Sequence, residues 1–130
     1  MTRIVCLILA SSILILQSAS GDEVRHTAFA GAIVGTWAPT ADRCGANDKS
    51  SIAISKTNYS DANGRCRVEW IVETAGSLGP NYSVHTTCAD PSQPGKTHAA
   101  NLIIRPESNG GISIGTSFID LKTYQRCPTK

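Results

Sequence analysis

The sequence predicts an all-β fold, a small antiparallel up-and-down barrel or closed sandwich of about seven to eight strands with two disulfides. Apolar and polar residues alternate over short stretches, turn residues interrupt them at nearly even intervals, and helical periodicity is almost absent. Gly35-Thr36-Trp37 opens this pattern, and four spaced cysteines follow it. One large aromatic near the start of such a chain can plug a small barrel.

The first twenty residues predict a secretory signal peptide. Arg3 supplies the positive start, residues 4–16 form an apolar run, and residues 18–20 are the small residues found at cleavage sites. The run is too short to cross a bilayer comfortably, so we expect no membrane span. Residues 1–20, which include the fifth cysteine, Cys6, are then removed. Residues 21–130 remain as one β-barrel domain that is periplasmic or secreted.

The charge balance argues against nucleic-acid binding. The whole chain has 12 Lys and Arg residues against 10 Asp and Glu residues, and loss of the signal peptide removes one of the basic ones, Arg3. This near-neutral balance gives no electrostatic basis for binding nucleic acid or a charged membrane surface.

The first half of the domain shows two short strands separated by a loop. Residues 33–38 read as a strand that Pro39 ends, and residues 51–55 alternate in the strand period. The intervening stretch, residues 40–50, has loop composition, and residues 60–64 carry a turn signal. Before the first strand, residues 25–33 could form a short helix.

The clearest prediction is a hairpin in the middle of the chain. Its first strand alternates so that one face is core and the other, charged face meets water. We expect the inward face to carry Cys66, Val68, Trp70 and Val72. Centring the hairpin near Ser77 pairs these residues, in order, with Cys88, Thr86, Val84 and Tyr82.

Three more strands complete the predicted barrel. Residues 99–105 form a strand that Pro106 closes, and a tight turn at residues 108–111 leads to a strand at residues 112–114. The chain ends with a strand within residues 118–127.

The four cysteines predict two disulfides, because an exported domain of this size has a limited core. In an up-and-down meander Cys44 and Cys127 lie at one end of the strands and Cys66 and Cys88 at the other. A strand of about eight residues spans roughly 26 Å, whereas bonded cysteines need Cα atoms within about 7 Å. This favours Cys44 with Cys127 and Cys66 with Cys88. A loop at residues 39–50 that ran down the outside would instead allow Cys44 to reach Cys66.

These residues carry a resemblance to known proteins. The opening of the domain resembles that of small periplasmic inhibitor barrels, such as bacterial metalloprotease inhibitors. The shared features are the Gly-Thr-Trp, the loop cysteine, the Ile-Ala-Ile strand at residues 52–54 and the cysteine at the start of the next long strand. These inhibitors are similar in outline to lipocalins. The whole order, with Tyr124-Gln125-Arg126-Cys127 at the end, also resembles a group of uncharacterised exported proteins of Gram-negative bacteria. The lipocalin likeness implies that Trp37 plugs one barrel end and that Arg126 packs across it.

No motif for catalysis or cofactor binding appears. The sequence lacks an H-E-x-x-H pair and a phosphate-binding loop. A nucleophile elbow is not expected either, because the G-x-S-x-G string at residues 111–115 covers a predicted strand and does not form a strand-to-helix turn. The cysteine spacings contain no C-x-x-C pair, and His26, His85 and His98 do not cluster, so zinc is disfavoured. We therefore expect no catalytic residue, no metal and no cofactor, and a protein that is not an enzyme.

One loop stands out as a candidate for partner binding. It combines small residues with an apolar side chain that a bare turn does not need, and it comprises Gly76, Ser77, Leu78, Gly79 and Asn81. The sequence thus favours a protein-binding module whose partner is an envelope or host hydrolase. Most concretely, we expect it to inhibit a lysozyme, a lytic transglycosylase or a protease. The alternative is a lipocalin-like carrier of a small apolar ligand, which needs a cavity on the order of 300 Å³.

Overall fold

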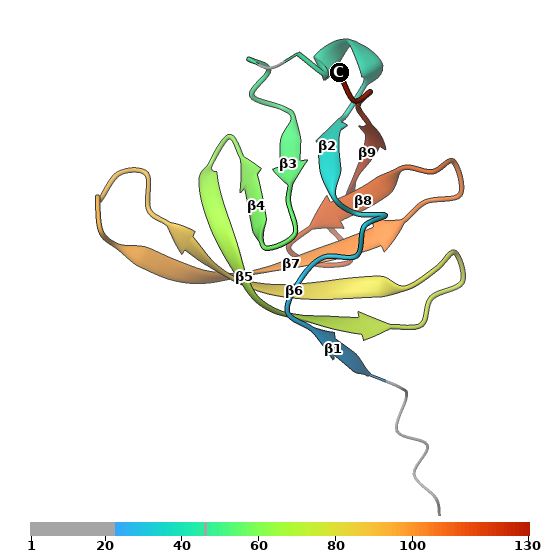
Figure 1. Ribbon diagram of the computed structural model, residues 1–130, viewed down its shortest axis with the longest axis horizontal. Helices are drawn as coiled ribbons and strands as arrows, with labels where there is room; N and C mark the ends of the chain where they lie inside the picture. The colour runs from blue at the N-terminus through green and yellow to red at the C-terminus, as the bar shows by residue number, and fades with distance from the viewer. Residues whose placement is uncertain (1–22, 46) are drawn as a thin grey trace, which may run out of the picture.

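The computed structural model describes residues 23–45 and 47–130 and contains nine strands there (Figure 1). The predicted signal peptide, residues 1–20, lies outside the described residues. The elements are β1 (Val24–His26), β2 (Gly35–Ala38), a 3-10 turn (Ala41–Arg43), β3 (Ile52–Ile54), β4 (Asn58–Asp61), β5 (Gly64–Thr74), β6 (Asn81–Ala89), β7 (Thr97–Pro106), β8 (Ile112–Gly115) and β9 (Lys122–Arg126).

Eight of these strands close an antiparallel barrel. From β2 to β9 each strand pairs with the next along the chain, and β9 returns to pair with β2 through Trp37 opposite Arg126. The up-and-down all-β barrel predicted from the sequence is therefore confirmed. The additional strand, β1, pairs with the second half of β5, past the end of β4 (Figure 1).

The alternation of apolar residues explains where the core lies. Branched aliphatic side chains from most strands point into the barrel, where they are almost completely buried together with Phe29, Tyr59 and Tyr82. The aliphatic members of this core are Ile33, Ile52, Ile54, Val68, Ile71, Val84, Ile104, Ile112 and Ile114. Val68 and Val84, for example, each lie between polar neighbours that point to the other face of the sheet, as a half-solvated antiparallel sheet requires.

Trp37 is buried in the barrel core, and Arg126 packs over its ring, as the lipocalin resemblance implies for this pair. The Trp37 side chain is 1% exposed, and its indole N–H donates to the Ile33 carbonyl at 2.9 Å. The Arg126 guanidinium lies 4.3 Å from the centre of the ring. Arg126 also donates to the carbonyls of Val34, at 2.8 Å, and Ala32. This one side chain therefore ties β9 to the segment that enters β2.

Both predicted disulfides are confirmed. Cys44 bonds to Cys127 with the Cα atoms 5.5 Å apart, and Cys66 bonds to Cys88 with the Cα atoms 3.9 Å apart. The first bond closes a span of 83 residues, and loop entropy gives such a closure about 4.5 kcal/mol of stabilisation. The second joins directly opposed residues of the β5–β6 hairpin, in the predicted register.

The prediction that Trp70 is a core residue is wrong. A β-bulge between Val68 and Trp70 shifts the register, so that Trp70 lies opposite His85 and Ile71 lies opposite Val84. Past the bulge, the residues expected on the inward face therefore lie on the outward face, and the reverse. Ile71 is fully buried, whereas Trp70 is 41% exposed. The same shift moves Val72 from its predicted inward position.

Three smaller expectations also differ from the structure. Residues 25–33 form no helix; they contain the last two residues of β1 and a turn at residues 31–33. The turn signal at residues 60–64 overlaps a real strand, β4, which pairs with both β3 and β5. The last strand begins at Lys122, because residues 116–121 form a loop.

Candidate functional site

Two glycines set the shape of the β5–β6 loop. A Cβ on Gly76 would lie 2.5 Å from the Gly79 carbonyl oxygen and 2.9 Å from the side-chain amide nitrogen, Nδ2, of Asn81. Gly79 has a φ of +128°, a conformation that other residues rarely adopt, and a Cβ there would lie 3.1 Å from the Pro106 ring. The loop is thus a defined turn packed against the end of β7.

This turn holds Leu78 outward. The Leu78 side chain is 54% exposed. A second apolar loop lies nearby, at residues 116–121, where Phe118 is 60% exposed and Ile119 is 94% exposed. Ser117 and Asp120 close that loop through a side-chain hydrogen bond of 2.8 Å. Burying such side chains against a partner removes apolar surface from water, which favours association.

Arg105 of β7 and Glu107, which follows that strand, line the same hollow as Leu78 and Phe118. The Arg105 guanidinium donates to the Glu107 carboxylate at 3.2 Å, and Ser113 donates a short hydrogen bond to the same carboxylate. The Ser113 hydroxyl and, after it, the Arg105 guanidinium hold the pKa of Glu107 below its usual range. Glu107 therefore stays ionised at neutral pH. The Arg105 Nε–H is enclosed and has no acceptor within the described residues.

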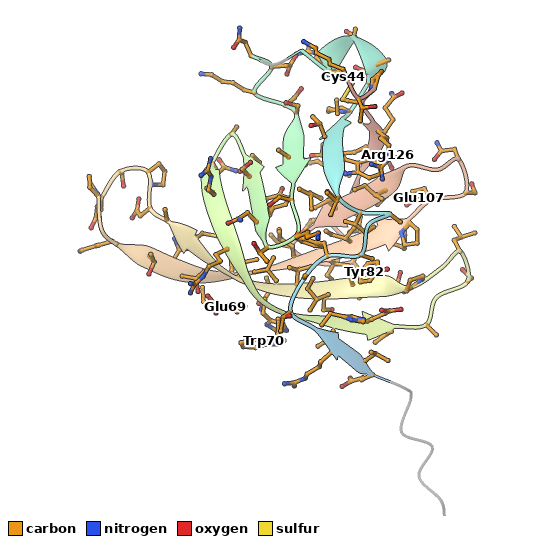
Figure 2. The ribbon with its side chains drawn as sticks, in the orientation of Figure 1. Cys44, Glu69, Trp70, Tyr82, Glu107 and Arg126 are labelled. Atoms are coloured by element: carbon orange, nitrogen blue, oxygen red, sulfur yellow. A yellow bond between two sulfur atoms is a disulfide. The ribbon has the colours of Figure 1, made fainter. Side chains whose placement is uncertain are left out.

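Together these residues form one groove of about 260 Å³ at the end of the barrel where β5, β6 and β7 meet. We call it the Leu78–Phe118 groove. It is lined by Ser77, Leu78, Gly79, Asn81, Arg105, Glu107 and Phe118. Figure 1 shows the β5–β6 and β7–β8 turns at the same end of the barrel, and Figure 2 shows Glu107 at the end of β7.

The structure brings together most of the partner-binding residues that the sequence predicts. Four of them, Ser77, Leu78, Gly79 and Asn81, line the groove, and the fifth, Gly76, shapes the turn behind it. Sequence reasoning missed the other side of the groove, which Arg105, Glu107 and Phe118 form. The sequence does contain a signal for the loop that carries Phe118, because the turn-forming residues Ser117 and Asp120 flank an apolar pair. The prediction of a strand from residue 118 concealed this signal.

A second hollow opens at the opposite end of the barrel, next to the Cys66–Cys88 disulfide. Its volume is about 160 Å³, and Tyr59, Thr86 and Leu102 are among its lining residues. Burial raises the pKa of the Tyr59 hydroxyl, and the neighbouring Asp61 carboxylate adds to this effect. Tyr59 is therefore neutral and donates to Asp61 at 3.0 Å. This volume is well below the 300 Å³ or more of typical small-molecule sites.

Metal-binding geometry is absent from the described residues. No group of three or more His, Cys, Asp and Glu side chains within residues 23–45 and 47–130 is placed to hold an ion together. In the same part of the chain, no helix is long and apolar enough to cross a membrane. Comparisons with models of protein families, with curated proteins and with solved structures give no match.

Proposed function

We propose that this chain is an exported protein-binding module that inhibits a hydrolase, and that the hydrolase docks on the Leu78–Phe118 groove. The target is a peptidoglycan-cleaving enzyme, either a lysozyme or a lytic transglycosylase, or a protease. The protein acts by occupying the partner's cleft and needs no cofactor of its own. Two disulfides in a small barrel are compatible with a periplasmic or extracellular site of action.

The observation that carries this proposal is the exposure of three apolar side chains at one end of the barrel. Leu78, Phe118 and Ile119 are each more than half exposed and belong to two loops, and the first two line one groove. Between them Arg105 and Glu107 offer a donor and an acceptor for polar groups of a partner. An apolar anchor surrounded by polar side chains is the usual anatomy of a protein interface.

The rigidity of the loop supports the same function. The β5–β6 hairpin is paired along most of its length and crosslinked at its far end by Cys66–Cys88. Gly76 and Gly79 fix the turn that presents Leu78. A loop that is already ordered loses little conformational entropy on binding, which favours high affinity.

The carrier alternative is less well supported. The hollow beside the Cys66–Cys88 disulfide is small, and Trp37 fills the barrel interior near β2 and β9. A larger hollow of about 460 Å³ lies along β2, β3 and β4, but polar residues such as Ser55, Asn58 and Arg65 line it, which does not suit an apolar ligand. A carrier of an apolar ligand would also gain nothing from Leu78, which points out to solvent.

An inhibition assay tests the proposal. Mature protein is added to lysozymes, a lytic transglycosylase and proteases of several classes, and hydrolysis of peptidoglycan or peptide is followed. Leu78→Asp should weaken inhibition by about 30-fold or more, because a hot-spot anchor contributes about 2 kcal/mol or more. Gln93→Asp introduces a carboxylate at the exposed β6–β7 loop, at the opposite end of β6, and should inhibit like the unmodified protein.

Two results would contradict the proposal. One is a complete lack of inhibition and of captured envelope protein at micromolar concentration. The other is equal inhibition by the Leu78→Asp and unmodified proteins. Thermal unfolding of both variants establishes that any loss is not a loss of fold.

A further inference from the structure

The β-bulge in β5 places an indole ring on the outside of the barrel. Trp70 is 41% exposed, while Ile71, the next residue, takes its place in the core. Strict alternation along the strand would have buried the larger side chain instead. Bulges often turn a side chain toward a functional surface, so the exposed ring calls for a role outside the core.

The ring is held in a fixed orientation on one side and is open on the other. Trp70 stacks on His85 with the ring centres 4.5 Å apart and an interplanar angle of 21°. On the other edge of β5, the pairing with β4 ends at Arg67 and the pairing with β1 begins at Ile71. Within the described residues no strand therefore pairs with β5 at Trp70 on that edge. Figure 2 shows Trp70 projecting away from the barrel.

Polar side chains flank this platform. Arg67 donates to Glu69 at 2.9 Å, and both lie just before Trp70 on β5. The Arg67 guanidinium and then the Thr87 hydroxyl lower the pKa of the Glu69 carboxyl, so it is ionised at neutral pH. On the far side of His85, the next strand places Asn101 directly opposite it. The outer face around the ring thus carries a carboxylate and a guanidinium on β5 and, two strands away, an amide.

We propose that Trp70 is the stacking platform of a glycan-binding site on the outer face of β5 and β6. The ligand is a β-1,4-linked pyranose chain. Such rings carry their substituents equatorially and so have flat faces of C–H groups, which pack on an indole. Their hydroxyl groups lie at the ring edge, where Glu69 and Asn101 can accept and donate hydrogen bonds.

The surroundings favour a glycan over other macromolecules. A stable protein interface buries about 800 Å² on each partner around an apolar centre, whereas here one exposed indole stacks on an imidazole, with Val72 as the apolar neighbour on its own strand and polar side chains around them. The two charged residues next to the ring on β5, Arg67 and Glu69, pair with each other. The positive charge of Arg67 is therefore balanced by its own neighbour, which disfavours nucleic acid as the ligand. A single sugar ring matches the indole in size.

Fluorescence titration of the mature protein with a soluble N-acetylglucosamine oligomer tests this site. The chain has two tryptophans, and Trp37 is buried, so a change in emission reports on Trp70. Trp70→Ala should weaken binding measured by calorimetry about ten-fold or more, the scale of losing one stacked ring. Trp70→Phe, which keeps an aromatic face, should bind more tightly than Trp70→Ala.

The groove provides the matched control. Leu78→Asp should bind the oligomer like the unmodified protein, because this site does not depend on the proposed inhibition. The inference is overturned if the oligomer causes no spectral change at millimolar concentration, or if Trp70→Ala binds it normally. It is equally overturned if sedimentation shows that Trp70 instead joins two copies of the chain.

Discussion

Replacing Ile71 should destabilise the protein far more than replacing Trp70, although Trp is the larger side chain. Ile71 is fully buried opposite Val84, so Ile71→Ala leaves a cavity and should lower the free energy of unfolding by about 2–5 kcal/mol. Trp70 is 41% exposed and packs mainly on His85. Trp70→Ala should therefore cost only about 1 kcal/mol, the size of one aromatic pair.

Urea unfolding followed by circular dichroism, with both disulfides oxidised, measures this difference. We expect the urea midpoint of Ile71→Ala to fall well below that of Trp70→Ala. In thermal unfolding, the two melting temperatures should differ by about 4 °C or more. An additional control is Val68→Ala, which precedes the bulge and keeps the predicted inward facing. If Trp70→Ala were the more destabilising change, the bulge would be misplaced and the sequence-derived facing of the whole strand would be correct.

Two further predictions concern the barrel closure and the groove. Arg126→Ala removes the cation over Trp37 and two hydrogen bonds to carbonyl groups. It should therefore lower the free energy of unfolding by about 1–2 kcal/mol and shift the fluorescence emission of Trp37, and Arg126→Lys should have an intermediate effect. Because folding lowers the pKa of Glu107, its contribution is complete above the ordinary glutamate pKa of about 4.3 and declines as pH falls through the folded value. Glu107→Gln should therefore lower stability at pH 7 but not at pH 2, as denaturant titrations at both pH values would show.

The barrel and its disulfides could be predicted because their signals are local or geometric. The alternation in the β5–β6 hairpin aligns Cys66 with Cys88 without any knowledge of the other strands, and the up-and-down order then leaves Cys44 with Cys127. Both inferences depend on strand periodicity and on the short reach of a disulfide.

The bulge could not be predicted because the sequence is compatible with two choices of which residues of β5 face the core. Trp70, Ile71 and Val72 are consecutive apolar residues, so either Trp70 and Val72 or Ile71 can face inward. Alternation decides the facing only where polar residues separate the apolar ones. The strand β4 was missed for a related reason, since Tyr59 is its only large apolar residue and turn-forming residues follow it.

Half of the candidate groove was accessible from the sequence. The loop around Leu78 shows itself by composition, as an apolar residue between two glycines. The opposite side, from Arg105, Glu107 and Phe118, comes from segments 24 or more positions away in the chain. Only the order and register of β6, β7 and β8 bring them beside the loop.

Site-specific photo-crosslinking in an envelope extract tests the proposed function most directly. A photoreactive phenylalanine analogue replaces Phe118 in the groove or, as the control, Gln93 at the opposite end of β6. The proposal predicts that mass spectrometry finds a peptidoglycan hydrolase or a protease bound at position 118 and not at position 93, and that Leu78→Asp removes this product. Crosslinking of no hydrolase at position 118, or of the same proteins at both positions, would contradict it.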